Sequence, residues 1–74
     1  MLATTINDSI QGNITNNSDV ITSISSTSGI KVGMFIHHAA FPVNTQVVEI
    51  TSGTSITVSN KATATANSSQ FHYI

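Results

Sequence analysis

The side chains that could carry acid–base or metal chemistry are few and widely spaced. Their order matches no nucleophile elbow and no phosphate-binding glycine loop. A chain of 74 residues also offers little room for a substrate pocket of about 300 Å³. The sequence therefore predicts a protein that is not an enzyme and needs no cofactor. The residues considered are Asp8, Asp19, Lys31, His37, His38, Glu49, Lys61, His72 and Tyr73.

The adjacent pair His37-His38, with His72 as a third ligand, is the one arrangement that suggests a metal. Neighbouring side chains on a β-strand point to opposite faces, so the pair cannot share one ion unless the strand bulges. A ring of identical histidines across a symmetric oligomer is the alternative. We expect these histidines to serve at an interface or on a strand surface, and we expect no metal site.

The composition limits the classes of partner. Only 7% of the residues are charged, and Lys31 and Lys61 are the only cations besides histidine. Nucleic acids and anionic membranes are both held by clustered basic residues, so neither is an expected partner. The chain has no cysteine and so no disulfide to support a small core. Self-association or docking onto a partner is therefore expected.

The start of the chain resembles no targeting segment. Residues 1–8 lack both a basic region and an apolar run of about 7–15 residues, and no stretch approaches the roughly 20 apolar residues of a membrane span. We expect synthesis in the cytoplasm.

Short β-type runs separated by turn clusters dominate residues 19–74. Val20, Thr22 and Ile24 are expected on one face of the first strand, followed by a hairpin-like connection. Ser52-Gly53 predicts a hairpin turn, and the Ala/Thr alternation over 62–66 a loop or weak edge strand. Further strands are expected over 34–38, 46–50, 54–58 and 70–74. The prediction is all-β: one small antiparallel sandwich or barrel of five to six short strands.

Residues 1–18 are the least regular part. Ile6, Ile10 and Ile14 recur every fourth residue, as on a helix, but the intervening Asn, Thr and Gly are poor helix formers. We expect an N-terminal arm or edge strand over 1–18 and a small β domain over 19–74.

The pattern over residues 27–65 is similar to a β module that recurs in bacteriophage structural proteins. The similarity is carried by Gly29-Ile30-Lys31-Val32-Gly33-Met34, then Phe41-Pro42-Val43-Asn44-Thr45, then strands ending in Ile50 and Val58 and an Ala-Thr-Ala-Thr tail. It covers about half of the chain. His37-His38-Ala39-Ala40 departs from the glycine-rich stretch of similar modules, which suggests a contact loop particular to this chain.

The resemblance implies a virion component. A free-standing module favours a capsid decoration, or cement, protein that binds the major capsid protein on the virion surface, with a homotrimer as the expected oligomer. A tail, neck or fibre component that binds a receptor or a glycan is the alternative, and a host adhesin fragment is a third reading. The expected contact residues are Ile6, Ile10, Ile14, His37, His38, Phe41, Pro42, Phe71, Tyr73 and Ile74.

Overall fold

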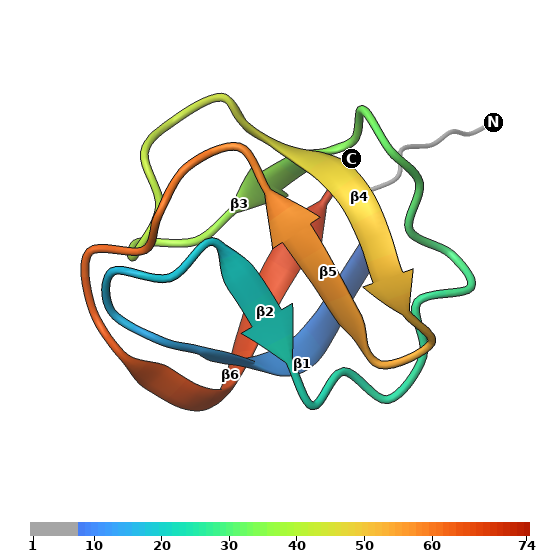
Figure 1. Ribbon diagram of the computed structural model, residues 1–74, viewed down its shortest axis with the longest axis horizontal. Coiled ribbons are helices and arrows are strands. Elements are labelled where there is room, and N and C mark those ends of the chain that lie inside the picture. The colour runs from blue at the N-terminus through green and yellow to red at the C-terminus, as the bar shows by residue number, and fades with distance from the viewer. Residues whose placement is uncertain (1–7) are drawn as a thin grey trace, which may run out of the picture.

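A computed structural model describes residues 8–74 as a small closed β-barrel (Figure 1). All strand pairs are antiparallel, and the order around the barrel is β1-β2-β5-β4-β3-β6. The expected all-β architecture is confirmed, and its form is a barrel. The strands are β1 (Asp8–Ile14), β2 (Val20–Thr22), β3 (Phe35–His37), β4 (Thr45–Ser52), β5 (Ser55–Val58) and β6 (Ala66–Tyr73).

The barrel closes because β6 pairs on both sides. One side of β6 runs along β1, from Asp8 opposite Tyr73 to Ile14 opposite Ala66. The other side meets β3, where Ile36 lies opposite Tyr73. Closure gives each of the six strands a neighbour on both sides, which is how barrels limit open-ended strand pairing with other chains.

Of the two alternatives expected for the N-terminal segment, arm or edge strand, its described part forms a strand, which is paired on both sides and is therefore not at an edge. Residues 8–14 form β1, which pairs with β2 and β6, so this segment is one of the six strands of the barrel. Its inward positions are Ile10, Gly12 and Ile14, which explains the fourfold spacing of the isoleucines. Ile6 and the remainder of the expected arm before Asp8 lie outside the described residues.

The inward face of β2 also differs from the prediction. Ile21 is buried, whereas Val20 is half-buried and Thr22 is exposed. Ser23 has a positive φ of 55°, and this break in the alternation turns Ile24 back into the core. The strand then pairs with β1 and β5, so the connection to β3 is not a hairpin.

The predicted turn at Ser52-Gly53 is confirmed, since β4 and β5 pair directly across it. The Ala/Thr segment is mainly a loop. Ala62 is buried and exchanges backbone hydrogen bonds with the β1–β2 connection, from Asn17 N–H to its carbonyl and from its own N–H to Ser18 O. Ala66 already belongs to β6.

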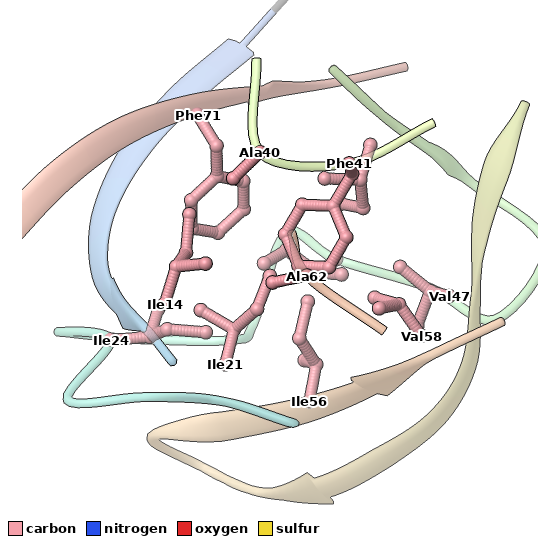
Figure 2. Packing of buried hydrophobic residues seen from close by; sticks show 12 residues of the cluster. Ile14, Ile21, Ile24, Ala40, Phe41, Val47, Ile56, Val58, Ala62 and Phe71 are labelled. Atoms are coloured by element: carbon pink, nitrogen blue, oxygen red, sulfur yellow. The ribbon is translucent and has the colours of Figure 1, made fainter. Parts of the chain in front are cut away.

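The core is built from β-branched side chains and two phenylalanines (Figure 2). Figure 2 shows Phe71 and Phe41 reaching inward above the isoleucines. Phe71 has no exposed surface, and Phe41 is 7% exposed. Most of the apolar side chains of the barrel are therefore buried in its own core. The remaining buried apolar residues are Ile14, Ile21, Ile24, Ile30, Ile36, Ala40, Val47, Ile56, Val58 and Ala62.

Thr45 is a fully buried polar residue that fixes the loop between β3 and β4. Its hydroxyl donates to the Pro42 carbonyl at 2.7 Å and accepts from the Asn60 side-chain amide at 3.1 Å. The hydroxyl proton and one lone pair are thus engaged by partners from two different loops. A buried hydroxyl of this kind is stabilising only while its partners remain.

Thr45→Val is therefore expected to lower the free energy of unfolding by about 1–3 kcal/mol, because it leaves the Pro42 carbonyl and the Asn60 amide without their partner. Urea denaturation followed by circular dichroism measures the loss. Thr51→Val is the matched control, since the Thr51 hydroxyl meets Thr57 on the exposed surface and water can replace it. The control should change stability by no more than about 0.5 kcal/mol. Equal losses for the two variants would contradict the role given to Thr45.

Candidate functional site

The large exposed apolar side chains gather around β3 and the strands beside it. They are Val32, 62% exposed, Phe35, 37%, Val48, 50%, and Ile74, 54%. With His37 and His72, which are also exposed, they form what we call the β3–β6 face. Val43 is 80% exposed but lies in the turn before β4 and is not part of it.

Backbone pairing brings the members of this face together. Phe35 and Ile74 exchange two hydrogen bonds, from Phe35 N–H to Ile74 O at 2.9 Å and from Ile74 N–H to Phe35 O at 3.0 Å. These two side chains are therefore direct cross-strand neighbours.

The turn at Val32-Gly33 joins the same surface to β4. The Gly33 N–H donates to the Val47 carbonyl at 2.8 Å, which holds the turn beside Val48. Gly33 adopts a φ of +96°, a backbone conformation that residues with an L side chain rarely adopt, so this turn requires glycine.

Val48 points outward by the ordinary alternation of β4, since its neighbour Val47 is buried opposite Val58. One of two consecutive valines therefore packs in the core and the other faces solvent. The register then shifts before Glu49 pairs with Thr57, so Glu49 is exposed as well and Ile50 packs against the core.

Three of the expected contact residues belong to the core. Ile14 and Phe71 have no exposed surface, and Phe41 has little. Side chains this deeply buried cannot contact a partner while the barrel is intact, so these three assignments are wrong. Ile10 is half-buried and packs against the same cluster.

The other expected contact residues reach the surface to different degrees. His37, Pro42 and Ile74 are exposed, whereas His38 and Tyr73 are half-buried. His37 and Ile74 belong to the β3–β6 face. Pro42 lies in the loop that follows β3, where its carbonyl accepts the Thr45 hydroxyl, so it is held with the loop and not with this face.

Sequence reasoning missed Val32, Phe35 and Val48. For Phe35 a signal existed: in the strand expected over 34–38, alternation places Phe35 on the face opposite to Met34 and Ile36. Ile36 is buried and Phe35 is exposed, as that alternation requires. The same alternation places Val48 on the face opposite to Val47 in the strand expected over 46–50.

The chemistry available at this face is apolar contact framed by neutral polar groups. Among residues 8–74, no group of three or more His, Cys, Asp or Glu side chains is placed to hold a metal ion. The same part of the chain contains no helix long and apolar enough to cross a membrane. Exposed apolar side chains that gather on one surface are typical of sites of protein contact.

Comparison with known proteins identifies no relative. No protein-family model matches the chain, and neither a curated protein nor a solved structure matches it.

Proposed function

We propose that this chain is a non-enzymatic structural protein of a bacteriophage virion that decorates the assembled capsid and bridges neighbouring capsid subunits. The single observation that carries the proposal is the β3–β6 face, an exposed apolar surface on a barrel whose other large apolar side chains are mostly buried. The resemblance of residues 27–65 to a module of bacteriophage structural proteins is the reason for proposing that the chain belongs to a virion.

The low charge of the chain suits this role. With two lysines, three carboxylates and no arginine, the surface offers little electrostatic repulsion to further copies placed close by. A shell carries many copies side by side, so a neutral Ser/Thr/Asn-rich exterior is compatible with dense packing. A homotrimer around a local symmetry axis of the shell is the oligomer that we propose.

The mechanism is additive. Each copy would bury its apolar face against the major capsid protein, with about 800 Å² per partner in an interface of ordinary size. Separation of two subunits then requires that this contact be broken. Closure of the barrel contributes rigidity, because a partner that pulls on β3 or β6 pulls on strands paired on both sides.

The first test is the copy number and position of the chain in purified virions, measured by quantitative mass spectrometry and cryo-microscopy. Hundreds of copies spread over the shell are expected. A few copies at one vertex would instead assign the chain to the tail or neck, and absence from virions would overturn the proposal.

Val48→Ser is expected to weaken binding to capsids about fivefold, because a half-exposed valine that becomes buried contributes about 1 kcal/mol. The measurement is equilibrium binding of the purified variant to capsids that lack the protein. Val43→Ser is the matched control: it removes a more exposed valine that lies outside the β3–β6 face. Loss of binding by Val43→Ser alone would place the contact on the loop before β4 and would refute the assigned face.

A further inference from the structure

The pairing of β3 with β6 sets two histidines directly opposite each other. His37 and His72 are register partners in this antiparallel pair. Both are exposed, and each has a buried neighbour: Ile36 beside His37 and Phe71 beside His72. The alternation of the strands therefore directs both imidazoles outward from the same side of the sheet.

The third histidine is committed elsewhere. His38 Nδ1 accepts the Ala40 N–H at 2.9 Å, which leaves the proton of the neutral ring on Nε2, placed to donate to Ser69 Oγ at 2.8 Å. Both of its nitrogens are thus occupied. Within residues 9–74, no side-chain hydrogen bond engages the ring nitrogens of His37 or His72.

We propose that His37 and His72 form a two-imidazole site for a divalent transition-metal cation of the Zn²⁺, Cu²⁺ or Ni²⁺ type. Directly opposed residues have Cβ atoms about 4.5–5.5 Å apart. A tetrahedral ion bound at about 2.0–2.1 Å needs its two nitrogens about 3.3 Å apart, a separation that two rings leaning toward each other can reach. Water fills the remaining coordination positions.

The chemistry of the ligands selects the class of ion. Neutral imidazole suits zinc, copper and nickel, whereas calcium and magnesium prefer oxygen ligands. Copper should bind most tightly of the three, following the general order of affinity for nitrogen ligands.

The site spans one of the short pairings of the barrel wall. β3 has three residues, and its named register with β6 consists of Ile36 opposite Tyr73 and His37 opposite His72. A bound ion would link these strands beside the position at which the barrel closes. Because it binds the folded chain and not the separated strands, it should also raise thermal stability. This inference does not depend on capsid decoration.

The test is titration of the full chain with ZnCl₂, followed by two-dimensional NMR of the imidazole C–H groups, with CuCl₂ titration by calorimetry in parallel. The His37 and His72 resonances are expected to shift together to saturation while those of His38 stay unchanged. Addition of EDTA should reverse the shifts and return the melting temperature to its metal-free value.

His37→Gln and His72→Gln are each expected to weaken metal binding roughly tenfold or more, because one imidazole loses the advantage of a second ligand held nearby. His38→Asn is the matched control and should keep the affinity of the unaltered chain. Metal-free melting curves of His37→Gln and His72→Gln should coincide with that of the unaltered chain, since both side chains are exposed. Independent binding by each histidine, with additive small losses, would overturn the proposal, and so would shifts centred on His38.

Discussion

Phe71→Ala is expected to lower the free energy of unfolding by about 3–5 kcal/mol, enough to unfold most molecules of a domain this small at room temperature. The Phe71 side chain has no exposed surface and points inward from the strand that closes the barrel. Its removal leaves a cavity that neighbouring strands, each paired on both sides, cannot collapse to fill. Urea denaturation and the near-ultraviolet and far-ultraviolet circular dichroism of the variant measure the effect.

Phe35→Ala is the control for this prediction. It removes the same side chain from a paired strand, but Phe35 is 37% exposed and faces outward. The expected loss is about 1 kcal/mol or less. A loss as large as that of Phe71→Ala would mean that the inward and outward faces of the barrel have been assigned the wrong way round.

Gly12→Ala is the second large effect, expected to cost about 1–3 kcal/mol although alanine is the better residue for the backbone. A Cβ at Gly12 would lie 2.8 Å from Ile21 Cγ2, 3.1 Å from Ile24 Cγ1 and 3.2 Å from Phe71 Cε1. Three core side chains from three segments already occupy the space, so the added methyl group forces them apart. Thermal unfolding followed by circular dichroism reports the change.

Gly53→Ala provides the comparison, since a Cβ there meets nothing within 4 Å. Its melting temperature should stay close to that of the unaltered chain, and Gly12→Val should fall below Gly12→Ala. If Gly12→Ala melts at or above the temperature of Gly53→Ala, the close packing described at Gly12 is refuted.

Gly12 also explains why residues 1–18 were predicted only as an arm or edge strand. In β1 the inward positions are 10, 12 and 14, and the middle one carries no side chain. The alternation of apolar residues with a period of two was therefore hidden in the sequence, and only the four-residue spacing of the isoleucines could be seen. The space beside Gly12 is filled by the side chains of Ile21 and Phe71, which lie on other strands. The local sequence pattern around Gly12 gives no sign of these contacts.

The later strands could be predicted because their alternation is local. The runs that contain Ile36, Val47 and Ile56 alternate within a few residues, and each became a strand. The inward face of β2 could not be predicted, since it depends on the positive φ of Ser23, a residue type that does not usually require one. Closure of the barrel depends on pairing between β1 and β6, which sequence periodicity does not encode.

The candidate face was predicted only in part, because the core of the barrel takes up most of the large apolar side chains. Phe41 and Phe71 were expected to be contact residues because of the segments that contain them, the loop after His38 and the last strand. A barrel of this size needs its large side chains inside, and both phenylalanines were used there. The large apolar side chains that remain exposed at the candidate face are Val32, Phe35, Val48 and Ile74.

The double pairing of β6 has a consequence for biosynthesis. A ribosome that has completed residues 8–65 has made five strands, of which β1 and β3 each still lack one neighbour. Those two strands expose unpaired edges until residues 66–73 emerge and fit between them. The barrel therefore cannot close before residues 66–73 are available. Its closure joins segments that are distant in sequence, since β6 pairs with both β1 and β3.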